Sequence, residues 1–152
     1  MKFEGTVTID APIDRVWQHL TDPHVISECI PGLESLEIIT PGKEFKAVAA
    51  VGLGNMRVIF NTTAEWLDLQ PPHHAKMKAH GTAPGSATDV VSEMHLKNAP
   101  DNTTELEWTA DVVIVGKIAS TAARLMGGVT KKLTSLFFEC VKDKIEGGNS
   151  TD

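Results

Sequence analysis

Histidines are the residues of this chain best suited to hold a metal ion, and the sequence contains six of them. His73 and His74 lie near one expected strand together with His80, and His74 and His80 share its outward phase. A zinc site needs three or four convergent ligands, whereas this spacing is irregular and Lys76 and Lys78 lie on the same side. We therefore interpret these histidines as solvated surface residues and expect no metal site.

The sequence contains few residues that are candidates for covalent or acid–base catalysis. The sequence has no Gly-x-Ser-x-Gly motif that would present a serine nucleophile, and tyrosine is absent. Gly52-x-Gly54 is not a dinucleotide-binding loop, because Arg57 stands at the third glycine position and a strand follows. Three carboxylates of the last expected strand have an outward phase: Glu105, Glu107 and Asp111. We therefore expect no catalytic residue and no cofactor.

The two cysteines, Cys29 and Cys140, are too few for a disulfide scaffold, and they form no CxxC motif. Both lie on the faces of expected helices, so we interpret them as small buried hydrophobic residues. A bond between the two helices is the alternative, and the sequence does not decide between them.

The charge balance limits the partners of this chain. Fourteen Lys and Arg against 20 Asp and Glu give a formal net charge of −6, which argues against general nucleic-acid binding. The N-terminus has no apolar signal region, and no stretch approaches the ~20 apolar residues of a membrane span. We expect a cytoplasmic protein.

Hydrophobic periodicity divides the chain into one strand, two short helices, about six strands and one long helix. Alternation marks the strand over 2–10, and three- and four-residue steps mark helices over 12–20, 22–30 and 117–146. Turn residues separate the strands between 33 and 115, at 41–43, 52–55, 70–72, 81–85 and 99–102. These connections suit only hairpins, so we expect a seven-stranded antiparallel meander.

The expected elements do not fill the space between them. A helix is about 10–12 Å across, whereas seven strands make a sheet roughly 30 Å wide, so the sheet must curl or leave a hollow. Small residues have the inward phase: Gly5, Ala47, Ala49, Ala64, Ala75, Ala79, Ala87 and Ala110. We predict a cavity for an apolar ligand of modest size. The alternative is a solid core, in which the large residues Trp17, Phe45, Phe60, Trp66, Met77, Met94 and Trp108 meet the final helix.

The candidate ligand-binding residues are the large inward positions and the apolar stripe of the final helix. They are Phe60, Trp66, Met77, Val90, Met94, Trp108, Leu125, Val129 and Leu133. Arg124 lies beside that stripe and could bond a polar group at the cavity mouth, or could be a solvated flank. Gly127 and Gly128 would either open a portal there or allow close packing. The basic side of the helix could meet an anionic membrane leaflet, or be solvated.

Three motifs of this chain occur together in one protein family. Residues 11–23 read APIDRVWQHLTDP, residues 30–36 read IPGLESL, and VGKIA at 115–119 leads into ARL at 123–125 and LFF at 136–138. The first resembles the opening of the START-related, helix-grip (SRPBCC) superfamily. The three together resemble the CoxG family, which is named for a carbon monoxide dehydrogenase subunit. The resemblance covers residues 1 to about 146.

This resemblance implies an α+β helix-grip fold, in which a seven-stranded curved antiparallel sheet wraps around a long C-terminal helix, with two short helices after the first strand. Residues 1–146 would form the ligand-binding domain and 147–152 a flexible tail. The implied function is that of an accessory protein of a molybdenum-containing carbon monoxide dehydrogenase. It would carry a lipophilic quinone or lipid, or recruit the enzyme to the cytoplasmic face of the membrane. Longer members reach the membrane through a further tail, and residues 147–152 do not resemble one.

Two other functions are compatible with the same fold. A small-molecule cyclase or dehydratase would need polar side chains that converge inside the pocket, and the inward polar residues are only Thr62, Thr88, Ser92 and Thr104. A structural adaptor would have a filled core and bind no lipid. We expect a protein that is not an enzyme.

Overall fold

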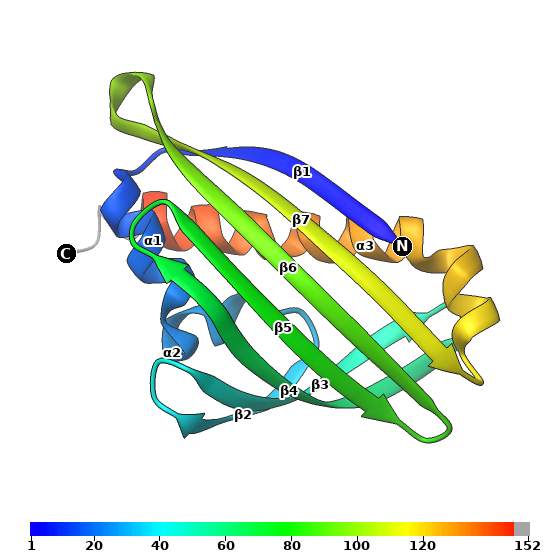
Figure 1. Ribbon diagram of the computed structural model, residues 1–152. Helices are drawn as coiled ribbons and strands as arrows, with labels where there is room; N and C mark the ends of the chain where they lie inside the picture. The colour runs from blue at the N-terminus through cyan, green and yellow to red at the C-terminus, as the bar shows by residue number, and fades with distance from the viewer. Residues whose placement is uncertain (148–152) are drawn as a thin grey trace.

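A seven-stranded antiparallel sheet curves around one long helix in the computed structural model (Figure 1), in the strand order β1-β7-β6-β5-β4-β3-β2. The structure describes residues 1–147. The strands are β1 Lys2–Ile9, β2 Leu33–Thr40, β3 Glu44–Leu53, β4 Met56–Gln70, β5 His74–Ala83, β6 Ser86–Ala99 and β7 Thr103–Gly116. Strands β2 to β7 form a meander, and β1 pairs with β7. The α+β fold class and the meander predicted from the sequence are confirmed.

Short helices close one end of the sheet. Helix α1 spans Ile13–Thr21 and begins after Pro12, and its buried residues follow at helical spacing: Ile13, Val16, Trp17 and Leu20. The Asp22 carboxylate accepts a hydrogen bond from the backbone N–H of His24 at 3.0 Å, so α2, Pro23–Ile26, begins with a capped first turn. A 3-10 turn over Ser27–Cys29 follows. The second predicted helix is therefore shorter than expected.

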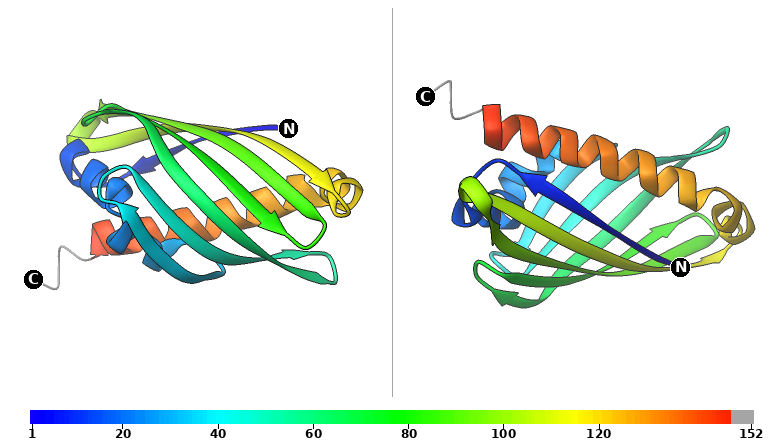
Figure 2. Two further views of the ribbon diagram at one scale, coloured as in Figure 1. Left: turned by 60° about the horizontal axis from the view of Figure 1, so that its bottom comes forward. Right: turned by 90° about the horizontal axis from the view of Figure 1, so that it is seen from above.

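Helix α3, Ala119–Lys142, lies along the open side of the curved sheet (Figure 2). A π-helical turn over Asp143–Gly147 continues it, so Gly147 ends a helical segment. The remainder of the predicted tail, 148–152, lies outside the described residues. Within residues 1–147, no helix combines the length and the hydropathy that a transmembrane span requires.

The strand register decides which residues face the helix. Ala64 pairs with Ala79 and Ala110 with Ser92, and a Cβ built on Gly81 would lie 3.2 Å from the Thr88 methyl carbon. Thr88 and Gly81 thus share the concave face, and Ala87, one residue before Thr88, points to the other side. The inward phase predicted for Ala87 is wrong, because adjacent residues of a strand point to opposite faces, and Thr88, which was also predicted to point inward, occupies the concave face.

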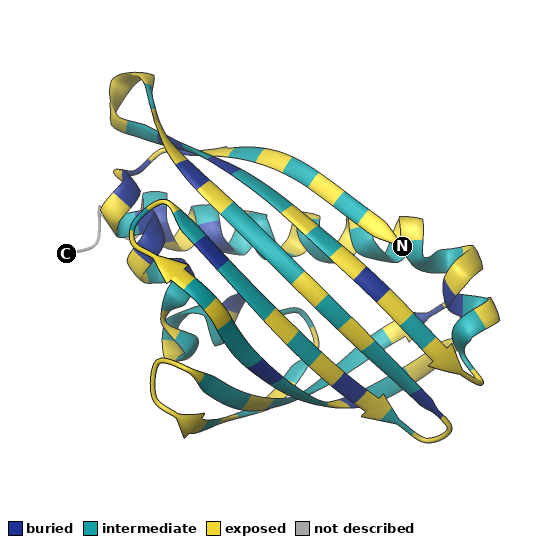
Figure 3. Cartoon of the chain, viewed as in Figure 1, coloured by how far each residue is buried: buried dark blue, intermediate teal, exposed yellow. Residues whose placement is uncertain are grey.

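The solid part of the core gathers at the α1 end of the sheet (Figure 3). Ile9 and Leu106 from the sheet, Val16 from α1 and Val141 from α3 are almost wholly inaccessible there. The Thr104 hydroxyl is buried with them and donates to the Ala11 carbonyl at 2.8 Å, which ties β7 to the start of α1. The space between the concave face of the sheet and α3 is therefore filled at the α1 end.

A disulfide joins Cys29 to Cys140, so the cysteines are not the free buried thiols that we favoured. The bond connects the turn after α2 to the last part of α3, with a Cα–Cα distance of 5.4 Å. The interpretation as free thiols failed because periodicity shows which face of a helix is apolar, but not which two helices lie side by side.

Candidate ligand-binding cavity

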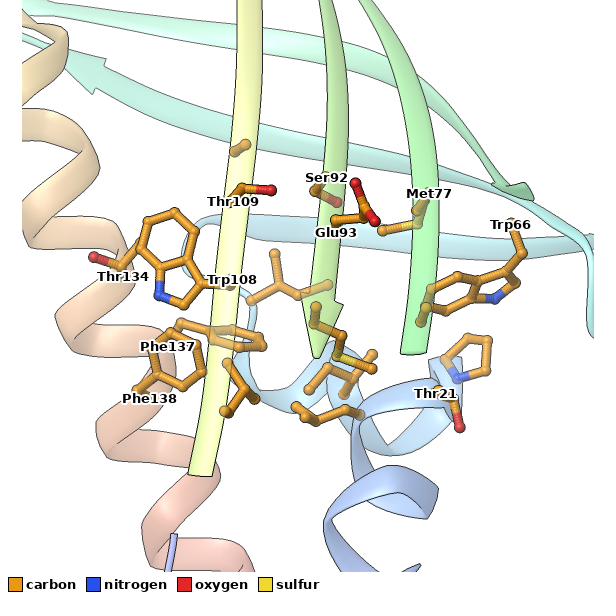
Figure 4. Close-up of a pocket in the computed structure, with 18 of the residues that line it drawn as sticks. Thr21, Trp66, Met77, Ser92, Glu93, Trp108, Thr109, Thr134, Phe137 and Phe138 are labelled. Atoms are coloured by element: carbon orange, nitrogen blue, oxygen red, sulfur yellow. The ribbon is translucent and has the colours of Figure 1, made fainter. Parts of the chain in front are cut away.

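A cavity of about 380 Å³ lies next to the solid core (Figure 4). Its walls come from the end of α1, from α2, from the concave face of β3 to β7 and from the later part of α3. The residues that line it are Leu20, Thr21, Pro23, Ile26, Ile30, Phe45, Trp66, Ala75, Met77, Ser92, Glu93, Met94, Leu106, Trp108, Thr109, Ala110, Thr134, Phe137 and Phe138. The volume falls in the range of small-molecule sites.

Cross-strand pairs form the sheet side of the cavity. Trp66 on β4 stands opposite Met77 on β5, and Met94 on β6 stands opposite Trp108 on β7. A small residue stands beside a large one in each row of paired residues across β5 and β6: Ala75 is paired with Met94, and Ser92 with Met77. Small residues beside large ones leave the volume in front of the sheet unfilled.

Glycine at position 5 lets the Trp108 indole lie close against β1. Gly5 and Trp108 are paired in the register of β1 and β7. A Cβ on Gly5 would stand 2.7 Å from Trp108 Nε1 and 2.9 Å from Cε2, closer than side-chain atoms pack. The absence of a side chain at position 5 thus sets the position of one cavity wall.

Two adjacent phenylalanines of α3 form the opposite wall. The rings of Phe137 and Phe138 meet edge to face, with centroids 5.0 Å apart and an interplanar angle of 80°, an arrangement that aromatic pairs favour. Cys140 lies two residues further along the chain, and its disulfide to Cys29 joins this wall to the segment that supplies Ile30. The α2 side and the α3 side of the cavity are therefore covalently linked.

The polar groups around the cavity are few. Within residues 1–147 the lining contains no histidine or aspartate, and its one acidic residue, Glu93, directs its carboxylate to the other face of the sheet, where it meets His74. The Glu93 carboxylate accepts from His74 Nε2 at 2.6 Å, and this hydrogen bond lowers the pKa of Glu93. An ionised carboxylate tied to a histidine is poorly suited to donate a proton. The Thr134 hydroxyl donates to the Thr130 carbonyl at 2.9 Å, so it offers a ligand mainly its lone pairs.

Four of the ten predicted site residues line this cavity: Trp66, Met77, Met94 and Trp108. The other six lie outside the lining. Phe60 is buried in β4, six residues before Trp66, and Val90 lies in β6, two residues before Ser92. The other four lie on α3: Leu125, Val129 and Leu133 are partly buried, and Arg124 is exposed. The cavity is displaced toward α1 and α2, whereas the sequence argument centred it on the middle of the sheet and of α3.

The cavity residues at the α1 and α2 end were not predicted from the sequence. Leu20, Ile26 and Ile30 lie in segments predicted to be helical without a role in the cavity, and Phe137 and Phe138 belong to a motif that was informative only for the family resemblance. Two adjacent aromatic residues of a helix cannot both lie on a narrow apolar stripe. The Phe137–Phe138 pair therefore indicated that the apolar face of this helix is wider at its C-terminal part.

The paired glycines of α3 lie apart from the cavity. Both Gly127 and Gly128 are exposed, and no neighbouring atom would be within 4 Å of an added Cβ on either. Close packing of another element against them is therefore absent among residues 1–147. Thr134, the nearest cavity residue of α3, is about 10 Å further along the helix than Gly127, so this cavity does not open at the glycines.

Residues 5–146 match the CoxG family, whose name describes a subunit of carbon monoxide dehydrogenase. The chain belongs to the CoxG family. The match spans both walls of the cavity and almost all of the described residues, so the resemblance inferred from the three motifs is confirmed. A comparison with curated proteins gives no match.

Solved structures with the same fold include a conserved protein of Geobacillus kaustophilus, with a TM-score of 0.89, 28% sequence identity and coverage of 97% of this chain and 96% of that one. The ZhuI aromatase/cyclase from Streptomyces sp. R1128 gives a TM-score of 0.74 at 21% identity, covering 96% and 93%. The di-domain aromatase/cyclase BexL of the BE-7585A biosynthetic pathway gives 0.67 at 20% identity, covering 96% of this chain and 50% of that one. The likeness to the two cyclases shows a shared fold.

Proposed function

We propose that this member of the CoxG family binds a lipophilic small molecule, a quinone or a lipid, as an accessory protein of a carbon monoxide dehydrogenase-like molybdenum enzyme. The single observation that carries the ligand part is the apolar cavity of about 380 Å³ between α2, the sheet and α3. The family name carries the partner part.

The chemistry of the cavity supports an apolar ligand. Aliphatic, aromatic and sulfur-containing side chains make up most of its walls, among them Ile26, Trp66, Met77 and Phe137. A ligand ring that buries about 200 Å² of apolar surface gains about 5 kcal/mol from its removal from water. Each further buried methylene contributes about 0.8 kcal/mol, so a ring that carries an alkyl chain would bind more tightly.

An organic extract of the purified protein tests the ligand part directly. Ala110→Phe places a ring in the cavity from β7, where Ala110 faces Ser92. Val113→Phe is the matched control, because Val113 lies on the same strand with 54% of its surface exposed. Mass spectrometry should detect a lipophilic molecule with the wild type and with Val113→Phe, and about tenfold less with Ala110→Phe, a difference of about 1.4 kcal/mol. Equal amounts from all three proteins, or none from the wild type, would refute the proposal.

Association with the enzyme is tested by affinity capture. The tagged wild-type chain should retain a molybdenum-containing dehydrogenase from a lysate of cells that express both proteins, identified by its polypeptides and by its metal content. Capture of ordinary cytoplasmic proteins without the dehydrogenase would contradict the partner assignment and leave the ligand assignment standing.

Peripheral membrane contact is part of the same proposal, and the outer side of α3 is its best-supported surface. Arg124, Lys131 and Lys132 are exposed there, and Leu136 exposes 44% of its surface near them. Basic residues near an anionic leaflet contribute about 1 kcal/mol each. The wild type should sediment with vesicles rich in phosphatidylserine at low salt, and K131E/K132E should remain in solution. Equal sedimentation of both would exclude this surface.

A cyclase or dehydratase activity is the alternative, favoured by the fold shared with the aromatase/cyclases. Within residues 1–147, Glu93 is the one acidic residue of the lining, and its position in β6 between Ser92 and Met94 directs its carboxylate to the opposite face of the sheet, where it bonds to His74. Such a site lacks the converging acid and base that the reaction needs. Recovery of a chemically altered product after incubation with an aromatic polyketone would favour the enzyme over the carrier.

A further inference from the structure

Two histidines and a carboxylate meet on the convex face of the sheet, opposite the cavity. Glu93 Oε2 lies 2.6 Å from His74 Nε2 and 3.6 Å from His95 Nε2. One ligand atom from each of these three residues lies within 4.8 Å of the other two. Their donor types, two imidazole nitrogens and one carboxylate oxygen, are those of His₂Glu zinc sites.

The strand register brings the three residues together. His74 on β5 is paired with His95 on β6, and Glu93 is paired with Lys76 two positions along. Residues that alternate along a strand share one face, so His95 and Glu93 lie on the same side as His74. The backbone pairing of β5 and β6 runs without a register shift from the Pro84–Gly85 turn to His74 and His95, so it fixes these residues opposite each other.

Neighbouring groups orient the His74 ring. Its Nδ1 lies 3.1 Å from Asp68 Oδ2 on β4, and the same oxygen accepts from Gln70 Nε2 at 2.8 Å. A carboxylate on one ring nitrogen of histidine leaves the other directed at a metal, and this arrangement recurs around zinc ligands. The His74 side chain is 17% exposed, so the ring is held by its surroundings, while the open side of the cluster faces solvent.

The local charge favours a cation. Asp68 and Glu93 contribute two carboxylates, and Glu107 is paired with His95 in the register of β6 and β7. Lys76 is the nearby opposing charge on the same face, and Lys97 already forms an ion pair with Glu107 at 3.2 Å. A divalent ion would therefore enter a site with more negative than positive groups.

We propose that His74, Glu93 and His95 form a binding site for a divalent transition metal such as zinc, held by His74 Nε2, a Glu93 carboxylate oxygen and His95 Nε2. In a tetrahedral site with bonds of about 2.0–2.1 Å, ligand atoms stand about 3.3 Å apart. The Glu93–His95 distance of 3.6 Å is close to this value. The ion replaces the proton between His74 Nε2 and Glu93 Oε2, and this proton is released to solvent. A water molecule would provide the fourth ligand.

A second histidine–carboxylate pair on the same strands supplies the control. His80 Nδ1 lies 2.7 Å from Asp89 Oδ1 on the same face of β5 and β6, with both side chains more than half exposed. This pair does not belong to the group of three potential ligands. Loss of His80 should therefore leave metal binding unchanged, whereas loss of His95 should weaken it.

Titration of the metal-free full chain with Co²⁺, followed by visible absorption and repeated with Zn²⁺ by calorimetry, tests the site. The wild type and His80→Ala should bind one equivalent and give the same cobalt spectrum. His95→Ala should bind about tenfold or more weakly, and Asp68→Asn, which removes only the orienting carboxylate, should weaken binding by about tenfold relative to wild type. His95 is 51% exposed, so its replacement leaves the fold intact, which circular dichroism verifies.

The outcomes separate cleanly. Stoichiometric binding that His95→Ala weakens and His80→Ala leaves unchanged supports the site. Failure of the wild type to bind one equivalent of either ion, equal binding by His95→Ala, or loss of binding with His80→Ala would overturn it.

Discussion

Replacing Gly5 with alanine should destabilise the protein, because the new methyl group occupies space that the Trp108 indole already fills. An added Cβ would lie 2.7, 2.9 and 3.0 Å from three indole atoms, whereas carbon atoms pack at about 3.5–4.0 Å. The indole is rigid, so the whole ring must move by most of 1 Å, and β1 blocks it on one side. The space available on the other side is the cavity.

The magnitude follows from a comparison with Gly52. Gly52 lies within β3, is exposed and has no atom within 4 Å of an added Cβ. Alanine restricts the unfolded chain equally at both positions, which stabilises by about 0.4–1 kcal/mol. The difference between Gly5→Ala and Gly52→Ala therefore reports the clash alone, for which overpacking predicts about 1–3 kcal/mol. Gly81→Ala, with Thr62 Oγ1 at 3.0 Å, should lie between them.

Urea unfolding of the three variants measures these differences. With a slope of about 2 kcal/mol per molar urea, the midpoints of Gly5→Ala and Gly52→Ala should differ by about 0.5–1.5 M, with Gly52→Ala the more stable. Binding of a hydrophobic fluorescent probe should fall for Gly5→Ala, because the displaced indole enters the cavity. Equal midpoints for the two variants would refute the packing of Trp108 against β1.

Two further predictions concern stability. Serine at Cys29 and Cys140 removes a cross-link between residues separated by 111 positions, so the free energy of unfolding should fall by about 2–5 kcal/mol; a wild type insensitive to reductant in urea would contradict the bond. Burial is the main cause that lowers the pKa of His19 from its ordinary 6.5, and Lys144 adds to it. The native state then binds a proton less readily than the unfolded chain, so stability should fall as the pH drops from 6.5 through the native pKa. The His19→Gln variant should lose less stability than the wild type over that pH range, as measured by urea unfolding at each pH. The same pH dependence of stability in both proteins would exclude His19 as its cause.

The order and type of the elements could be predicted because each obeys a simple period. Alternation through Met56 to Trp66 and through Thr104 to Ile114 places these residues on one face, and the register agrees. Periodicity also predicted a hollow, since a helix is narrower than a seven-stranded sheet.

The position of the hollow could not be predicted in the same way. It depends on how α1 and α2 pack against the end of the sheet, and on long-range contacts that no local pattern contains. The cluster around His74 was missed for a related reason. Its third member, His95, is distant in sequence, and only counting residue pairs outward from the Pro84–Gly85 turn places it opposite His74.

Affinity as a function of ligand length tests the central claim, that the cavity beside α2 and α3 binds an apolar molecule, most directly. Calorimetric titration of the wild type with benzoquinones carrying n-alkyl chains of increasing length should show affinity rising about fourfold per methylene, until the cavity of about 380 Å³ is full. Beyond that length the affinity should level off, and Ala110→Phe should reach its plateau at a shorter chain. Affinity that is independent of length, or the same dependence in Ala110→Phe and the wild type, would contradict binding in this cavity.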